Sequence, residues 1–283
     1  MTLTSRGTVL VTGCSTGIGK ATATAFHRRG WEVVATARRL EDVADLADQG
    51  MTTLTLDVLS EDSMKAAVSA VEAGQGGIGV LVNNAGYALQ GPVEETDLSE
   101  VRRQFETNVF GLVRMCQLVL PGMRERRRGR IINISSMGGR FTFPGGGFYH
   151  ASKHAVEALS DALRPEVAGF GIGVSLVEPG PVLTEFGNTA VGTIEDESFT
   201  GTGPYDDFRR RLGQAYTRAY DGRRTGLASS PEDVADVIVK AAEAARPRAR
   251  YLVGPVARAL VTARRVLPDR AFDALLRSQW PTP

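Results

Sequence analysis

Tyr149 and Lys153 are the residues whose types and spacing most directly suggest chemistry. They stand four positions apart at the start of an alanine-rich, helical stretch, and side chains four apart share one face of a helix. A phenol has an ordinary pKa of about 10, and a neighbouring cation favours the phenolate. The pair therefore predicts general acid/base catalysis by Tyr149. Taken alone, a tyrosine and a lysine four residues apart are common by chance, and they more often form a surface pair than a catalytic one.

A glycine-rich turn near the N-terminus is a candidate cofactor site. The apolar stretch Thr8–Thr12 leads into Gly13-Cys14-Ser15-Thr16-Gly17-Ile18-Gly19 and then into an alanine-rich helix. Backbone amides of such a turn approach a pyrophosphate, which the positive end of the following helix also attracts. The position of the turn, after the first strand and before a helix, favours a dinucleotide site over a plain connection.

The residues after the second strand indicate which dinucleotide is bound. About twenty residues past the last glycine, an NAD enzyme offers a carboxylate to the ribose, whereas an NADP enzyme offers arginine. Arg38 and Arg39 stand there and no carboxylate does, so we predict NADP(H), with the Arg38 guanidinium on the 2′-phosphate. The alternative is that both arginines only begin the next helix. Asp57 could accept from the adenine amine or be a turn residue.

Strand-like and helical stretches alternate along the chain. The expected strands are Thr8–Thr12, Glu32–Thr36, Thr53–Asp57, Val80–Asn83, Arg130–Ser135 and Gly173–Glu178. The expected helices are Ile18–Arg29, Glu41–Asp48, Ser60–Glu72, Leu98–Arg127 (divided near Asn108) and Tyr149–Ala168. Because several strands are almost wholly apolar, we predict a parallel sheet covered on both faces. This is a doubly wound, Rossmann-like α/β fold, in a single domain over residues 1–283.

Two segments depart from this alternation. Residues 183–227 mix Gly, Pro, acidic residues and aromatics, and so long a loop is usually functional or partly disordered. We expect a mobile substrate-binding lid. Residues 256–280 form an arginine-rich amphipathic tail, expected as two short helices divided at Pro268. It is expected to pack on the domain or a partner subunit, with contact to a membrane surface as the alternative. Capping patterns predict helix starts at Asp97–Glu100 and Ser230–Pro231.

Composition narrows the class of function. The 33 Lys and Arg balance 32 Asp and Glu, for a formal charge of +1, so no broad field favours nucleic acid or an anionic membrane. The basic run 124–130 more simply complements a helix C-terminus. Cys14 and Cys116 are too few for a disulfide framework, and three scattered histidines do not suggest a metal site. With no signal peptide or membrane span expected, we predict a soluble, cytoplasmic protein.

Several motifs together resemble the short-chain dehydrogenase/reductase family. They are Thr12-Gly13-x-x-x-Gly17-x-Gly19, Asn83-Asn84-Ala85-Gly86, Asn108, Ser135-Ser136, Tyr149-x-x-x-Lys153 and Pro179-Gly180. They appear in the family's order over roughly residues 8–186, and several spaced motifs are much more specific than one. Within the family the chain is most similar to the 17β-hydroxysteroid and retinol dehydrogenase-like branch.

The resemblance implies roles for four catalytic residues. Tyr149 exchanges a proton with the substrate oxygen, and Lys153 lowers the tyrosine pKa and holds the nicotinamide ribose. Ser136, thirteen positions before the tyrosine, is selected over Ser135 to polarise the substrate oxygen. Asn108 opens a helix and holds a water of the proton relay, although an Asn there could also only end one helix and cap the next.

The resemblance also implies a set of cofactor contacts. They are Gly13, Ser15, Thr16, Gly17, Ile18, Gly19, Arg38, Arg39, Asp57, Val58, Asn84, Ala85, Gly86, Tyr149, Lys153, Pro179, Gly180, Val182 and Thr184. Many NADP-preferring members carry a basic residue where this chain has Thr16, so most of the discrimination falls on Arg38. His150 stands where small residues are common, and we interpret it as a packing or rim residue.

Large side chains favour an apolar substrate. Those expected at the ligand-binding edge are Tyr87, Leu89, Phe141, Phe143 and Phe148. The resemblance implies hydride transfer between NADP(H) and a hydrophobic ketone, aldehyde or secondary alcohol, by a homodimer or homotetramer without a metal. One alternative is a catalytically silent NADP(H)-sensing protein, which would usually show a broken set of catalytic residues. The other is an extended-branch sugar epimerase or dehydratase, whose glycine turn is spaced differently.

Overall fold

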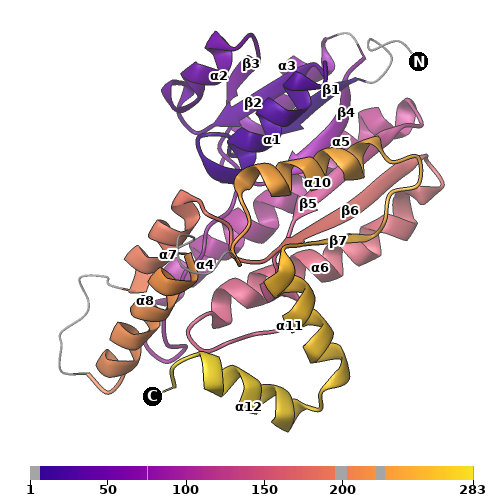
Figure 1. The fold of residues 1–283 in the computed structure, drawn as a ribbon. Coiled ribbons are helices and arrows are strands. Elements are labelled where there is room, and N and C mark those ends of the chain that lie inside the picture. The colour runs from indigo at the N-terminus through magenta and orange to yellow at the C-terminus, as the bar shows by residue number, and fades with distance from the viewer. Residues whose placement is uncertain (1–6, 75, 195–202, 221–226, 283) are drawn as a thin grey trace.

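The computed structural model is built on a parallel sheet of seven strands in the order β3-β2-β1-β4-β5-β6-β7 (Figure 1). The strands are β1 (Thr8–Val11), β2 (Val33–Ala37), β3 (Thr52–Thr55), β4 (Ile78–Asn83), β5 (Gly129–Ile134), β6 (Ile172–Pro179) and β7 (Arg250–Val253). The structure describes residues 7–74, 76–194, 203–220 and 227–282. The strand order reverses between β1 and β4, which is where open α/β sheets bind ligands. The expected doubly wound, Rossmann-like fold is confirmed.

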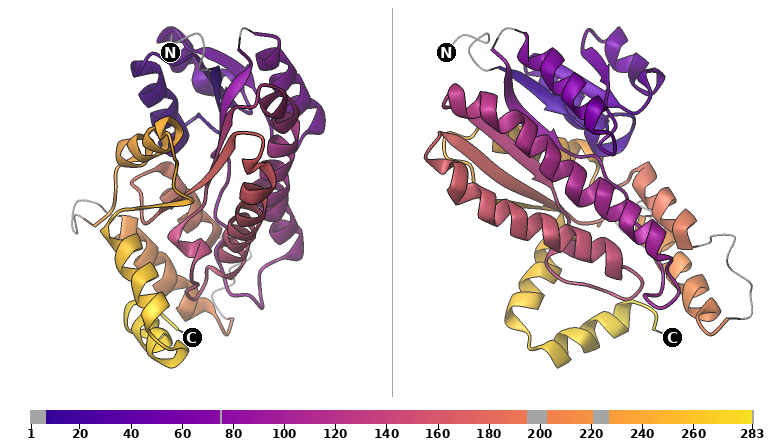
Figure 2. Two further views of the ribbon diagram at one scale, coloured as in Figure 1. Left: turned by 90° about the vertical axis from the view of Figure 1, so that its right-hand side faces the viewer. Right: turned by 180° about the vertical axis from the view of Figure 1, so that it is seen from behind.

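Helices cover both faces of this sheet (Figure 2). They are α1 (Gly17–Arg28), α2 (Ala44–Asp48), α3 (Glu61–Glu72), α4 (Leu98–Phe105), α5 (Leu112–Glu125), α6 (Gly147–Ala168), α7 (Glu185–Ile194), α8 (Asp206–Tyr220), α10 (Pro231–Glu243), α11 (Pro255–Val266) and α12 (Asp269–Gln279). One face packs on α1, α2 and α10, and the other on α3, α5 and α6.

The apolar strands follow from this double cover. In β1, Val9 and Val11 pack among the core residues of α1 and α10, whereas Leu10 packs among those of α3 and α5. Successive side chains of a strand point to opposite faces, so a strand that is buried on both must be apolar throughout. All three residues have no exposed surface. Burying such a side chain contributes about 1.5–3 kcal/mol.

The predicted helix starts are correct in position, and one differs in its bonding. The Ser230 hydroxyl accepts from Asp233 N at 3.1 Å, and the Asp233 carboxylate accepts from Ser230 N at 2.8 Å. This is a complete capping box, with Pro231 in the first turn. Asp97 caps α4 by accepting from Ser99 N at 2.6 Å. The reciprocal bond expected from Glu100 is not formed among the described residues.

Two regions contain helices or strands that were not predicted from the sequence. Strand β7 forms one edge of the sheet, and its residues were not predicted to be a strand or a helix. The segment 183–227, expected as a long loop, contains α7 and α8; its residues 195–202 and 221–226 lie outside the described part of the chain. On α8, Phe208, Leu212 and Tyr216 are buried and stand four residues apart. That helical spacing was the available signal.

The C-terminal tail forms two helices, α11 and α12, which are divided at Pro268 as predicted. They lie at the same end of the sheet as α7 and α8 (Figures 1 and 2). Phe272 and Leu276 of α12 are buried against Met137 and Phe141, so the tail packs on its own domain.

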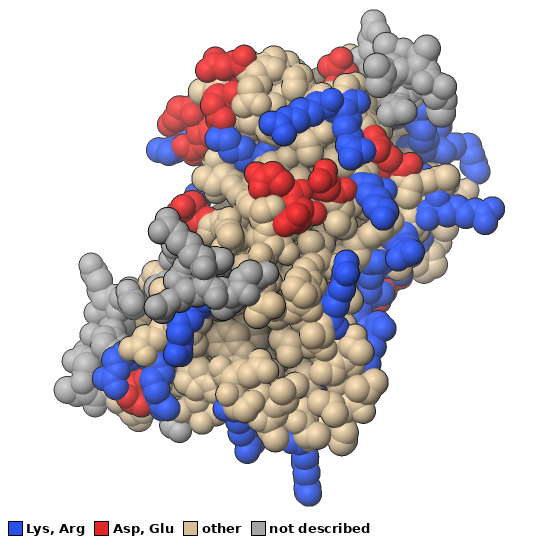
Figure 3. All heavy atoms as spheres, viewed as in Figure 1, with Lys and Arg blue, Asp and Glu red and all other residues tan. Residues whose placement is uncertain are grey.

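Charges of both signs are interspersed over the part of the surface formed by the first strands and their helices (Figure 3). Around α11 and α12 the same face carries fewer of them. Within the described part of the chain, no helix is both long and apolar enough to cross a membrane.

Candidate active site

A cavity of about 600 Å³ opens at the carboxyl ends of the strands and is lined by residues from segments far apart in the sequence. Most of the predicted site residues line it: Gly13, Ser15, Thr16, Gly17, Ile18, Arg38, Asp57, Val58, Asn84, Ala85, Gly86, Ser136, Tyr149, Lys153, Pro179, Gly180, Val182 and Thr184. Three predicted residues do not line the cavity but adjoin residues that do: Gly19 packs on Gly13, Arg39 follows Arg38, and Asn108 bonds Tyr87. The fold therefore brings nearly the whole predicted set together at the edge where such sheets bind ligands.

The glycine turn has a backbone that other residues would distort. Gly13 has φ +72° and Gly17 has φ +56°, in the left-handed region that favours glycine. A Cβ on Gly19 would lie 2.1 Å from the Gly13 carbonyl oxygen and 2.5 Å from Asn84 Nδ2. Glycine thus lets the turn pack closely on itself and on Asn84. The N-terminus of α1 follows directly, and a helix N-terminus after such a turn fits a pyrophosphate.

Thr12 and Asn84 brace this turn against the end of β4. Asn84 Nδ2 donates to the carbonyl oxygens of Thr12 at 3.0 Å and Gly13 at 2.9 Å. The Thr12 hydroxyl accepts from the backbone N–H of Asn84 and of Ala85, both at 3.0 Å. Asn84 lines the cavity while its amide is bonded to the turn. Thr12 begins the glycine-turn motif but was not predicted as a site residue. Its hydroxyl nevertheless connects the glycine turn to the segment after β4.

The two arginines after β2 have different surroundings. Arg39 is bonded to Asp42 at 2.5 and 3.1 Å, so its guanidinium is held against the following turn. Arg38 lines the cavity and forms no ion pair with another described residue. Asp57 also lines the cavity, and one of its oxygens accepts from Leu59 N at 3.0 Å. Of the two arginines, Arg38 is therefore the one that is available to a ligand phosphate.

Tyr149 and Lys153 lie in the first two turns of α6 and are both buried. Lys153 Nζ donates to the Ile134 carbonyl oxygen at 2.8 Å and lies 5.9 Å from the centre of the Tyr149 ring. This bond holds the ammonium group at the end of β5, where Lys153 lines the cavity. The shared helix face expected from the spacing is thus observed.

Burial dominates the protonation of this pair. It raises the pKa of Tyr149 to about 12, although a hydrogen bond with Ser136 acts in the opposite direction. Burial also lowers the pKa of Lys153 to about 8, opposed by the nearby Glu157 carboxylate. The family resemblance implied that Lys153 lowers the tyrosine pKa. Burial instead favours the protonated phenol of Tyr149, and Ser136 is the neighbour that favours its phenolate.

The two serines after β5 differ in their partners. The Ser136 hydroxyl accepts from Gly138 N at 3.0 Å and caps a short 3₁₀ turn, Met137–Gly139. The Ser135 hydroxyl is buried and has no hydrogen-bond partner among the described residues. Because Ser136 also bonds Tyr149, it is the serine beside the phenol, as the spacing of thirteen residues implied.

Asn108 lies in a widened helical turn. Between α4 and α5 the backbone is π-helical over Glu106–Gly111, and π-helical turns are frequent at functional sites. Asn108 Nδ2 donates to Tyr87 O at 2.9 Å and to Ser152 Oγ at 3.1 Å, and its Oδ1 accepts from Tyr87 N at 3.1 Å. The expected break near Asn108 is confirmed, and its side chain fixes the loop after β4 to α6.

Aromatic side chains form the wall beside Tyr149. Phe143 and Tyr87 line the cavity as predicted, whereas Leu89, Phe141 and Phe148 do not. Phe141 instead packs on Phe272, with ring centres 5.5 Å apart.

Three residues outside the predicted set complete this wall. Phe186, whose ring centre is 5.7 Å from that of Tyr149, and Tyr216 line the cavity. Trp280 stacks on Phe143 at 4.1 Å. They come from α7, α8 and the residue after α12, so only the tertiary structure brings them here.

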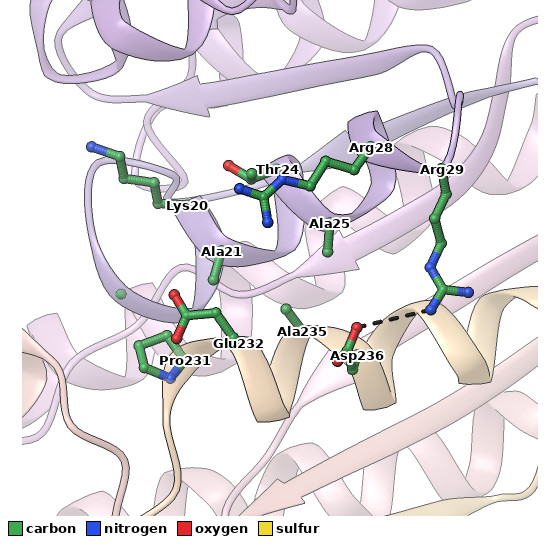
Figure 4. Close-up of a pocket in the computed structure, with 11 residues that line it drawn as sticks. Lys20, Ala21, Thr24, Ala25, Arg28, Arg29, Pro231, Glu232, Ala235 and Asp236 are labelled. Atoms are coloured by element: carbon green, nitrogen blue, oxygen red, sulfur yellow. Dashed lines mark ion pairs between the residues drawn. The ribbon is translucent and has the colours of Figure 1, made fainter.

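A second hollow lies between α1 and α10 (Figure 4). Its volume is about 420 Å³, and small side chains of α1 form its floor. Two of its cations are paired, Lys20 with Asp45 at 2.8 Å and Arg29 with Asp236 at 3.9 Å. It holds no acid/base pair of the kind found beside Tyr149, so the larger cavity is the candidate active site.

This fold and cavity define a class of dinucleotide-binding protein with a tyrosine–lysine pair beside the nucleotide turn. A family model described as short chain dehydrogenase matches residues 7–193. The chain belongs to this family of oxidoreductases, and the resemblance drawn from the motifs is confirmed.

The chain is also similar to individual members of the family. It is 39% identical to retinol dehydrogenase 8 of Bos taurus over 253 residues, covering 86% of this chain and 80% of the relative. It is 35% identical to an NADPH-dependent 3-dehydrocapnine reductase of Ornithobacterium rhinotracheale over 277 residues, covering 94% of each. A short-chain dehydrogenase structure from Streptomyces avermitilis superposes with a TM-score of 0.79 at 33% identity, covering 97% of this chain and 96% of that one.

Proposed function

We propose that this protein is an NADP(H)-dependent reductase or dehydrogenase that interconverts a hydrophobic ketone or aldehyde and the corresponding alcohol. The observation that carries the proposal is a single cavity lined by the glycine turn, Arg38 and the group Ser136, Tyr149 and Lys153. Two relatives support it, since one is an NADPH-dependent reductase and the other a retinol dehydrogenase. The aromatic wall formed by Phe143, Phe186 and Tyr216 favours an apolar substrate.

The residues of the cavity divide the work of binding and proton transfer. The glycine turn and the N-terminus of α1 would hold the pyrophosphate, and Arg38 would hold the 2′-phosphate. The bound cofactor would supply the hydride. Tyr149 would donate its phenolic proton to the substrate oxygen as negative charge develops there, and would take it back in the reverse reaction.

Ser136 and Lys153 would support Tyr149 in this transfer. The Ser136 hydroxyl, beside the phenol, would donate to the same substrate oxygen and stabilise its developing charge. Lys153 would hold the nicotinamide ribose and favour the phenolate that Tyr149 becomes.

The proposal is tested by replacing Tyr149 with Phe. Purified wild type and Tyr149→Phe are assayed for NADPH oxidation against a panel of apolar ketones and aldehydes, with NADH in parallel. Because only the phenolic oxygen is removed, we expect turnover to fall at least about 10²- to 10⁴-fold, with the NADPH dissociation constant little changed. Ser136→Ala should also lower kcat, by about 10²- to 10³-fold.

Retained turnover in Tyr149→Phe would contradict the assignment of the acid/base. NADPH binding without oxidation by any carbonyl in wild type would favour the cofactor-sensing alternative.

A further inference from the structure

His150 follows Tyr149 on α6 and is fully buried at the cavity wall. Its ring centre lies 5.6 Å from that of Tyr149 and 4.2 Å from that of Phe143. Glycines make room for it: a Cβ on Gly138 would lie 2.4 Å from its Cδ2, and a Cβ on Gly146 would lie 2.4 Å from its Cε1. The imidazole therefore occupies a defined position one residue from the acid/base.

The hydrogen bonds of this ring determine which nitrogen carries the proton. Nδ1 accepts from the backbone N–H of Phe143 at 3.4 Å. Burial lowers the pKa of His150 to about 3, so the ring is neutral near pH 7. A neutral imidazole with an accepting Nδ1 carries its proton on Nε2. His150 thus presents an Nε2–H donor.

That donor is unsatisfied. Nε2 is buried and has no hydrogen-bond partner among the described residues. A buried polar group left without a partner costs about 1–3 kcal/mol, and such a group in a native structure calls for an explanation. Other polar atoms of the cavity are in the same condition, among them the Ser135 hydroxyl and Gln90 Oε1, on a residue that is 2% exposed.

We propose that His150 Nε2–H donates to a second oxygen of the substrate, close to the carbonyl that Tyr149 protonates. This deepens the proposed function and rests on it. The substrate class is an apolar ketone or aldehyde that carries a hydroxyl or carbonyl oxygen near the reacting carbon. Because the His150 ring is uncharged, its donor matches a neutral oxygen rather than a carboxylate or a phosphate, and the Gln90 Oε1 acceptor matches the proton of a hydroxyl.

Two matched ketones and two matched variants test the inference. The ketones are a long-chain methyl ketone and the α-hydroxyketone of equal chain length. His150→Phe keeps an aromatic ring and removes the donor. His154→Phe removes an imidazole that is exposed on the same helix. The measurement is kcat/KM for each ketone with saturating NADPH.

We expect wild type and His154→Phe to prefer the α-hydroxyketone. His150→Phe should lower kcat/KM for that ketone about 5- to 150-fold, as loss of a buried hydrogen bond implies, and leave the methyl ketone unaffected. Equal kcat/KM for the two ketones in wild type would overturn the inference while the proposed function stands. So would an equal loss of kcat/KM on both ketones in His150→Phe. Failure of wild type to oxidise NADPH with either ketone would count against the proposed function itself.

Nitrogen NMR of the wild-type protein gives a readout that does not depend on turnover. The chain has three histidines, so the spectrum of His150→Phe identifies the signals of His150. We expect Nε2 protonated and Nδ1 unprotonated, with Nε2 shifting on addition of NADP⁺ and the α-hydroxyketone but not the methyl ketone. A proton on Nδ1, or a charged ring near pH 7, would overturn the inference whatever the activity.

Discussion

Replacing Arg38 with Ala should remove most of the preference for NADPH over NADH. Arg38 lines the cavity and makes no ion pair with another described residue, so its guanidinium is available to the 2′-phosphate. Arg39→Ala is the matched control, because the Arg39 guanidinium is already bonded to Asp42 at 2.5 Å. The two variants remove the same charge from neighbouring positions.

The size of the effect follows from the contact that is lost. A hydrogen bond to a charged group contributes about 1.5–3 kcal/mol, which corresponds to about 10- to 150-fold in affinity. Arg38 is exposed, and exposed charges are screened by salt. We therefore expect the lower end, about a 10-fold weaker NADPH affinity at physiological ionic strength, and a larger loss at low salt.

The assay is a titration of NADPH and NADH fluorescence with wild type, Arg38→Ala and Arg39→Ala at two salt concentrations. NADH affinity should be unchanged in all three proteins, because NADH has no 2′-phosphate. Arg39→Ala should leave NADPH affinity close to wild type. A loss of NADPH affinity in Arg39→Ala and not in Arg38→Ala would refute the reasoning, as would an equal loss of NADH affinity in Arg38→Ala.

Three further predictions concern the turn, a buried carboxyl and the helices over the cavity. Gly19→Ala should lower the free energy of unfolding by about 1–3 kcal/mol, because its Cβ would meet the Gly13 carbonyl; urea unfolding would show no change if the turn can shift. Burial and the Glu157 carboxylate raise the pKa of Glu178, so the folded protein keeps a proton that the unfolded chain loses above a pH of about 4.3. Wild type should lose stability as pH rises from there through the raised pKa, and Glu178→Gln should not; parallel pH profiles would contradict this. Amides of α7 and α8 should exchange faster than those of β5 and become protected by NADPH and substrate; equal protection without ligand would rule out a mobile lid over 183–227.

Local patterns in the sequence are sufficient to predict the parallel sheet and the glycine-rich nucleotide turn. The apolar stretches of β1 and β4 are buried on both faces, and such burial requires an unbroken apolar pattern that can be read directly. Gly13, Gly17 and Gly19 are needed for backbone conformation and close approach, which are properties of one short segment. The helix start at Ser230 and the break at Asn108 were predictable for the same reason.

The aromatic wall and the protonation of the site depended on the tertiary structure. Phe186, Tyr216 and Trp280 are far from Tyr149 in sequence. Only the packing of α7, α8 and the tail brings Phe186 and Tyr216 to the cavity and stacks Trp280 on Phe143. Tyr149 and Lys153 could be paired from their spacing, but their pKa values are governed by burial. Burial is a sum over neighbours from the whole chain, so the residue types and spacing determined which groups react, and the fold determined how strongly each holds its proton.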